Sequence, residues 1–103
     1  MNRIEKLLEY LQQMPNDNFL RHALALEYIK LENDEEATFL FEAILKDSPD
    51  DIGSYYHLGK LLERSGKTNE AIACYEKGMS EAKKVNEQHA HNELQAAYED
   101  LVY

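Results

Sequence analysis

Residues 55–75, YYHLGKLLERSGKTNEAIACY, repeat the pattern of residues 21–41, RHALALEYIKLENDEEATFLF, at a spacing of 34. The residues that recur in register are Leu24, Ala25, Asp34, Ala37 and Phe41, which correspond to Leu58, Gly59, Thr68, Ala71 and Tyr75. A period of this length is typical of helical repeat arrays. One helix pair cannot bury its apolar face alone, so neighbouring pairs stack, and the stack forms a groove that is the expected functional surface.

Apolar spacing and two prolines predict where the helices run. Ile4, Leu7, Leu8 and Leu11 form one stripe on a helix over residues 2–13. Pro15 and Pro49 end helices at matching points of the period, because proline lacks the amide hydrogen that a helix interior uses. The polar residues at the turns predict four helix N-caps, since short polar side chains accept hydrogen bonds from free amides: Asn16, Asp34, Asp50 and Thr68.

Small and aromatic residues predict how the two helices of each unit pack. Four small residues lie where helix backbones must approach closely, and two aromatic residues fill the space beside them. The small residues are Ala25, Ala37, Gly59 and Ala71, and the aromatic residues are Phe41 and Tyr75.

The two ends complete the predicted array. Residues 1–15 form a half-unit helix, residues 18–51 and 52–85 are the two repeats, and residues 86–103 form a C-terminal capping helix. We therefore expect one all-α domain of about six helices without strands. The polar stretch 83–88 is expected to separate the last two helices, although neither proline nor glycine enforces a break there, and one continuous helix is the alternative.

The residues that carry the period resemble the tetratricopeptide repeat. The first copy presents Arg21, Leu24, Ala25, Tyr28, Ala37, Phe41, Ile44 and Pro49, and the second presents Tyr55, Leu58, Gly59, Leu62, Gly66, Ala71, Tyr75 and Gly78. The copies depart from each other mildly, with Glu32 where the second has Gly66 and Lys83 where the first has Pro49. The resemblance implies a right-handed superhelical array of antiparallel helix pairs that serves as a scaffold or adaptor for protein–protein contact.

The resemblance also implies which residues line the groove, because the first helix of each pair faces the concave side in this family. Those positions hold Phe19, His22, Leu26, Ile29 and Lys30 in the first unit and Tyr56, Lys60, Glu63 and Arg64 in the second. Aromatic, aliphatic and basic residues together suit an extended peptide or a helix with an apolar anchor and a negative group. We expect a non-catalytic module that binds such a segment of another protein.

Two alternatives to groove binding are open. The C-terminal helix could fold back onto Leu26, Ile29 and Tyr56 and bury them in the core. The chain could also associate with itself as a homodimer through its terminal helices, because residues 101–103 are apolar up to the end of the sequence.

A more specific resemblance is not supported by the residues. Some tetratricopeptide domains hold the C-terminal tail of heat-shock chaperones in a carboxylate clamp made of lysine, asparagine and arginine. The corresponding positions of this chain carry His22, Leu26, His57, Glu87 and His91. Leucine and neutral histidine cannot form the charge-assisted hydrogen bonds that a carboxylate requires, so we do not expect a clamp.

Composition excludes several other classes of function. The 103 residues carry a net charge of −9, with 11 basic and 20 acidic side chains, which argues against nucleic acid as a partner. No apolar stretch is long enough to cross a membrane, and the N-terminus lacks a secretory signal. Cys74 is the single cysteine, which fits a reducing compartment and predicts a cytoplasmic protein.

Catalytic and metal sites are not expected either. His89 and His91 are two residues apart and would lie on different faces of a helix, and zinc needs three or four convergent ligands. His22 and His57 lie on neighbouring first helices and could approach each other. No phosphate-binding loop, catalytic triad order or zinc signature is present, so we predict no enzyme and no cofactor.

Overall fold

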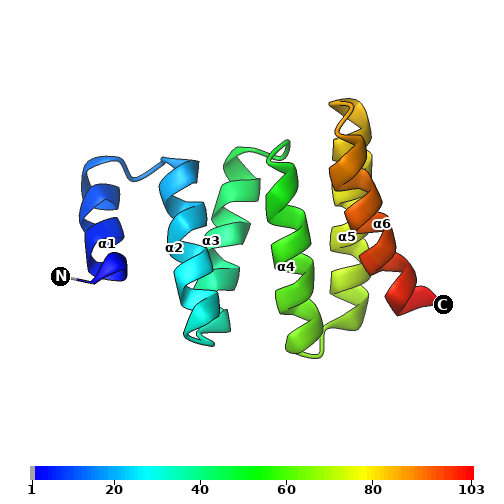
Figure 1. Ribbon diagram of the computed structural model, residues 1–103, viewed down its shortest axis with the longest axis horizontal. Coiled ribbons are helices and arrows are strands. Elements are labelled where there is room, and N and C mark those ends of the chain that lie inside the picture. Colours follow the sequence, from blue (N-terminus) through cyan, green and yellow to red (C-terminus); the bar gives the residue numbers. More distant parts are fainter. Residues whose placement is uncertain (1) are drawn as a thin grey trace.

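In the part of the chain that the structure describes, six helices follow one another in a row, and each runs antiparallel to the one before it (Figure 1). The computed structural model describes residues 2–103. The helices are α1 Arg3–Gln13, α2 Asn18–Lys30, α3 Asp34–Asp47, α4 Ile52–Arg64, α5 Thr68–Lys84 and α6 Gln88–Val102. The expectation of an all-α repeat array is confirmed, and the described residues contain no strand. The chain does break between α5 and α6.

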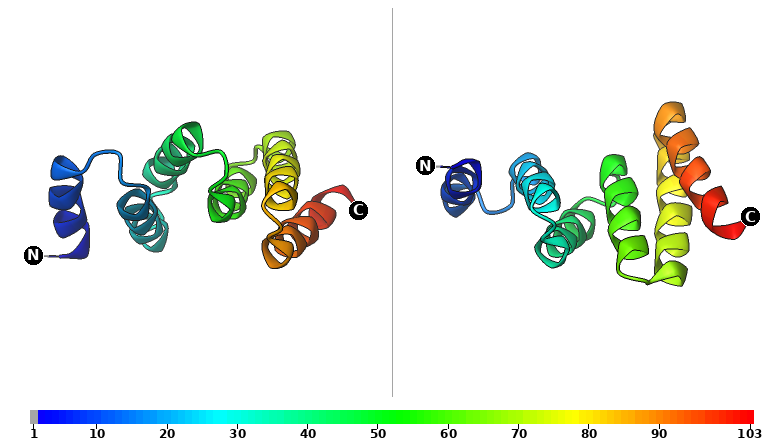
Figure 2. Two further views of the ribbon diagram at one scale, coloured as in Figure 1. Left: turned by 90° about the horizontal axis from the view of Figure 1, so that it is seen from above. Right: turned by 60° about the horizontal axis from the view of Figure 1, so that its bottom comes forward.

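The helices form two layers. The views in Figure 2 place α2, α4 and α6 on one side of the array and α3 and α5 on the other, with α4 set back between its two neighbours. Each helix packs against the next one along the chain, and α6 also packs against α4.

The small and aromatic residues of the repeat occupy the core, as predicted. Ala25, Ala37 and Phe41 of the first pair are fully buried, as are Ala71 and Tyr75 of the second. Helix α1 contributes less to the interior, because Leu7 is its one buried side chain among the described residues.

A left-handed residue closes three of the turns. Glu32, Gly66 and Asn86 have φ of 59°, 79° and 59°. In each case the amide of the next residue bonds to the carbonyl five residues earlier, as in Lys67 to Leu62 at 2.9 Å. Asparagine is one of the few residues besides glycine that adopts this conformation readily, so Asn86 ends α5 without a glycine or proline.

These turns correct two predicted N-caps. Asp34 and Thr68 are the first residues of α3 and α5, and the cap positions belong to Asn33 and Lys67. The left-handed residue reverses the chain so sharply that the next helix starts one residue earlier than expected. Neither Asn33 nor Lys67 donates or accepts a side-chain capping bond.

The two turns that contain proline show that the other two predicted N-caps, Asn16 and Asp50, were also wrong by one residue. The amide of Asp17 bonds to the carbonyl of Met14 at 3.2 Å, so Pro15 and Asn16 are the central residues of a four-residue turn. The cap is therefore Asp17, whose Oδ1 accepts the Leu20 amide at 3.0 Å. Residues 48–51 repeat this turn, and the residue after Asp50 is the cap of α4.

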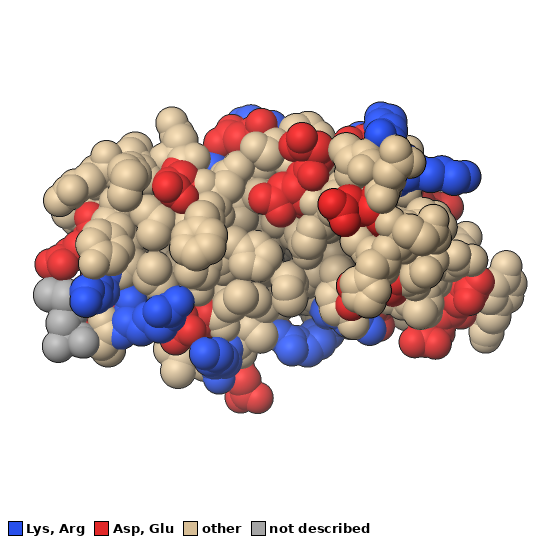
Figure 3. All heavy atoms as spheres, turned by 45° about the horizontal axis from the view of Figure 1, so that its top comes forward, with Lys and Arg blue, Asp and Glu red and all other residues tan. Residues whose placement is uncertain are grey.

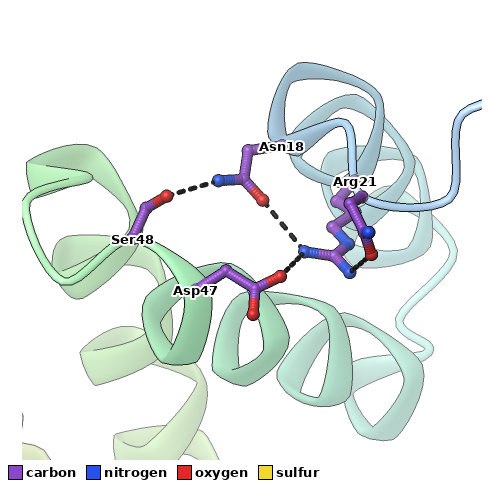
Figure 4. A network of polar contacts seen from close by, with 5 residues as sticks. Asn18, Arg21, Asp47 and Ser48 are labelled. Carbon is purple, nitrogen blue, oxygen red and sulfur yellow. Dashed lines mark hydrogen bonds and ion pairs between the residues drawn. The ribbon is translucent and has the colours of Figure 1, made fainter.

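A polar network links the start of α2 to the end of α3 (Figure 4). The Arg21 guanidinium donates to Asp47 Oδ2 at 2.7 Å and to Asn18 Oδ1 at 3.0 Å. It also donates to Asn16 Oδ1 at 3.2 Å, and Asn18 Nδ2 donates to Ser48 Oγ at 2.8 Å. This network fixes the two helices of the first pair where their apolar core ends.

Candidate functional site

The predicted groove residues belong to two helices of the layer formed by α2, α4 and α6. Helix α2 carries Phe19, His22, Leu26, Ile29 and Lys30, and α4 carries Tyr56, Lys60, Glu63 and Arg64. Figure 3 shows this side partly tilted toward the reader: uncharged surface runs across the middle, and Lys and Arg side chains gather along its lower edge. These residues do not all lie close together.

A cleft of about 390 Å³ brings four of them to one place. It lies between α1 and α2 and is lined by Arg3, Phe19, His22, Ala23, Leu26, Glu27 and Lys30. Phe19 is 80% exposed, which is unusual for a phenyl ring and places an apolar contact at the edge of the cleft. Arg3 is a member of this cleft that sequence reasoning missed, because the position of α1 over α2 depends on tertiary packing.

A cluster of aromatic rings joins the two helices of the layer. The ring centroids of His22 and His57 are 5.4 Å apart, and each histidine lies 5.3 Å from the buried Phe41. Tyr56 continues the cluster, with its ring 5.9 Å from that of His57. The predicted approach of His22 and His57 is therefore confirmed, and the partly exposed rings of His22, His57 and Tyr56 form a floor that runs from α2 to α4.

The titration of His57 follows from this position. Burial lowers the pKa of His57, and the neighbouring His22 lowers it further, whereas Glu93 on α6 acts in the opposite direction. A neutral imidazole is therefore favoured on the floor at pH 7. Glu93 reaches this region because α6 packs against α4.

The basic groups of this surface are partly engaged. Glu27 Oε2 accepts Lys30 Nζ at 3.0 Å and lies 3.3 Å from Arg3 Nε, and hydrogen bonding to Lys30 lowers the pKa of Glu27. Lys60 Nζ lies 5.5 Å from the centre of the Tyr56 ring and 3.6 Å from Glu63. These exposed pairs hold the cations at the edge of the apolar floor and leave them in contact with solvent.

Arg64 lies apart from the other predicted residues. Its guanidinium donates two hydrogen bonds to Asp34, at 3.0 Å from Nε and 2.7 Å from Nη2. Asp34 belongs to α3, so Arg64 points toward the opposite layer. The repeat position alone did not reveal this contact, because Asp34 is 30 residues away in the sequence.

The C-terminal helix leaves the surface accessible. Leu26, Ile29 and Tyr56 pack on the edge of the core, and each keeps part of its side chain exposed. Helix α6 buries its own apolar residues, Leu94 and Ala97. It therefore extends the layer of α2 and α4 instead of covering it.

The remaining reactive residues do not form a second centre. Burial raises the pKa of the Cys74 thiol to about 12, and its Sγ donates to the Tyr55 carbonyl at 3.4 Å. His89 pairs with Glu93 at 3.5 Å, whereas His91 is partly buried with an unpartnered Nδ1. In residues 2–103 no group of three or more His, Cys, Asp or Glu side chains converges on a metal position. None of the helices there combines the length and apolar character that crossing a bilayer requires.

Comparison with known proteins agrees with this architecture. The tetratricopeptide repeat family model matches residues 52–84. A TPR repeat-containing protein of Methanocaldococcus jannaschii is 38% identical over 58 residues, which is 56% of this chain. This chain spans 17% of that relative's length.

Two solved structures are also similar. A tetratricopeptide repeat domain protein of Salinibacter ruber is 42% identical, and the match covers 84% of this chain and 88% of that one with a TM-score of 0.80. The TPR2B domain of yeast Sti1, in its pHsp70 complex, has a TM-score of 0.88 at 15% identity, over 96% of this chain and 79% of that one. The second likeness concerns the fold alone. Together with the repeated helix pairs, these matches show that the chain belongs to the tetratricopeptide repeat family, whose fold is a protein–protein interaction module.

Proposed function

We propose that this chain binds a peptide or a helix of another protein on the surface of α2 and α4. The observation that carries the proposal is the ring cluster of the partly exposed His22, His57 and Tyr56, which runs from α2 to α4 and is supported by the buried Phe41. The cleft beside Phe19 adjoins it, since His22 belongs to both. A floor shared by two helices can hold a segment longer than one side chain.

The chemistry of this surface favours a segment with apolar anchors and at least one acidic group. Phe19 and Leu26 offer apolar contact, and Lys30, Lys60 and Arg3 stand at the edges. Aromatic residues contribute strongly to binding energy in interfaces, whereas charges at the rim mainly influence association rate and orientation. Arg64 would contribute to binding only after its hydrogen bonds to Asp34 break. The single cysteine fits a reducing compartment, which supports the cytoplasm as the place of this binding.

Affinity capture from a lysate of the source organism tests this proposal. The bait is the wild-type chain beside a Phe19→Ser/Leu26→Ser variant, with Phe39→Ser as a control for an exposed phenylalanine on the other layer. We expect a protein that wild type and Phe39→Ser retain and the double variant loses. A truncation series of that protein should then reduce binding to one segment. Equal capture by all three baits would contradict the assignment of this surface.

Self-association is the second candidate function. Tyr103 is 94% exposed, and Leu8 and Tyr10 of α1 and Met14 directly after it are also exposed, so both ends of the array present apolar side chains. Light-scattering mass over a concentration series distinguishes the two functions. A mass of 12.0 kDa at every concentration supports binding of a different protein, and a rise toward twice that value supports a homodimer.

A further inference from the structure

A second, larger cleft lies between α3 and the end of α4. It has a volume of about 600 Å³ and is formed by α3, the C-terminal end of α4 and the residue before α5. Its lining is Asp34, Glu35, Glu36, Thr38, Phe39, Glu42, Leu61, Leu62, Ser65 and Lys67. We call it the α3 cleft. None of these residues belongs to α2, so the α3 cleft is separate from the cleft beside Phe19.

The α3 cleft has an apolar floor and an exposed aromatic rim. Leu61 and Leu62 are buried, with 1% and 8% of their surfaces exposed, and they form the base. Phe39 at the rim is 69% exposed. An exposed phenyl ring beside an aliphatic base is a surface that excludes water well once a partner covers it.

The negative charge of the α3 cleft favours a basic partner. Glu35, Glu36 and Glu42 are exposed, and none of them has an ion-pair partner within residues 2–103. Asp34 is already paired with Arg64, so the lining keeps three free carboxylates against the single cation of Lys67. Stabilisation of the α3 N-terminus explains acids in the first turn, but it does not explain Glu42, which lies beyond that turn.

We propose that the α3 cleft is a second docking surface, which binds a basic segment carrying one large apolar side chain. The apolar side chain would lie on Leu61 and Leu62 beside Phe39, and lysine or arginine residues on either side would face the three free carboxylates. Arg64 holds the wall of the cleft by tying α4 to α3 through Asp34. Because the two clefts share no lining residue, one chain can hold two partners at once.

Fluorescence polarisation with a defined probe tests the proposal. The probe is the labelled peptide Lys-Lys-Phe-Leu-Lys-Lys, with Glu-Glu-Phe-Leu-Glu-Glu and Lys-Lys-Ser-Ser-Lys-Lys as control peptides. We expect the first peptide alone to bind, with an affinity that falls as salt rises. Phe39→Ser and Glu35→Gln/Glu42→Gln should each weaken binding about tenfold or more, since they remove the aromatic rim or the charge. Phe19→Ser should leave binding unchanged.

Nitrogen–proton correlation spectra locate the bound probe independently of affinity. We expect shifts in α3 and the end of α4, and unchanged thermal unfolding of the variants, whose altered side chains are all exposed. Three results would overturn the proposal: no binding at millimolar peptide, equal binding by all variants, or shifts confined to α2. A concentration-dependent mass that Phe39→Ser abolishes would also overturn it, because the occupant would then be a second copy of this chain.

Discussion

The two helix pairs carry different side chains at the same repeat positions, and these side chains make different connections. In the first pair Arg21 connects α2 to α3 through polar groups. In the second pair the equivalent residue is Tyr55, whose hydroxyl donates at 2.6 Å to the Pro49 carbonyl in the turn before α4, so this bond does not reach α5. The core differs as well, because Ala25 and Phe41 of the first pair correspond to Gly59 and Tyr75 of the second.

The second pair is packed more tightly as a result. A Cβ atom at Gly59 would lie 2.6 Å from Cζ of the Tyr75 ring, and one at Gly78 would lie 2.7 Å from Tyr55 Cβ. The Tyr75 hydroxyl also donates to the Glu63 carboxylate, which fixes the ring in place. The repeat thus tolerates either a polar connection or close backbone contact, provided that each pair keeps one of them.

Among the substitutions that test this comparison, Gly59→Ala in the second pair should have the largest effect on stability. The new methyl group would overlap the Tyr75 ring, and we expect a loss of about 3 kcal/mol in the free energy of unfolding. Urea denaturation followed by circular dichroism measures it. Gly59→Ala/Tyr75→Phe, which imports the residues of the first pair, should recover part of the loss because the ring is released from Glu63. A full loss in the double variant would show that the ring has no room to move.

Arg21→Ala should have a smaller effect on the first pair. The side chain is 13% exposed and makes three hydrogen bonds, whereas Asp47 is about half exposed. We expect a loss of about 1.5 kcal/mol. Arg21→Tyr is the matched variant, because Pro15 lies six residues before it, as Pro49 does before Tyr55. If Arg21→Tyr is no more stable than Arg21→Ala, the two connections are not equivalent.

The turns inside the two pairs give a third test. Glu32 and Gly66 are equivalent and both have positive φ, which strains glutamate but not glycine. We expect Glu32→Gly to raise stability by about 0.5 kcal/mol and Gly66→Ala to lower it by about 1 kcal/mol. Thermal unfolding by calorimetry detects both changes. A loss of stability in Glu32→Gly would mean that the strain at Glu32 is balanced by contacts in the native state.

The stability that the contact between the two pairs provides should decrease slightly at acidic pH. The pKa of His57 is lowered by burial, so the unfolded chain binds a proton more readily than the folded one. Stability from this group is present above about pH 6.5 and decreases as the pH falls through the lower folded pKa. His57→Phe should reduce the slope of stability against pH between 5 and 7, and His89→Gln, at an exposed position, should not. Equal slopes in both variants would contradict a role for His57.

The sequence alone predicted the repeat, the six helices and the buried residues, because these depend on local periodicity. Proline ends a helix through its own backbone chemistry, as Pro15 and Pro49 do. The spacing of the apolar residues along each helix places Ala37, Phe41, Ala71 and Tyr75 on its buried face. The division into residues 18–51 and 52–85 stays a prediction. The four predicted N-caps of α2 to α5 were wrong by one residue, since backbone turn geometry set where these helices begin, whereas the predicted start of α6 at Gln88 is confirmed.

The site was only partly predictable from the sequence. Periodicity placed Phe19, His22, Leu26 and Tyr56 on the first helices of the pairs, where the structure finds the ring cluster and the cleft. It did not place Arg64 beside Asp34, or Phe39 above Leu61 in the α3 cleft. Those contacts join segments about 20 to 30 residues apart, and their geometry depends on how one helix pair stacks on the next. The repeat pattern therefore determined the elements and their faces, and tertiary packing decided which side chains meet between them.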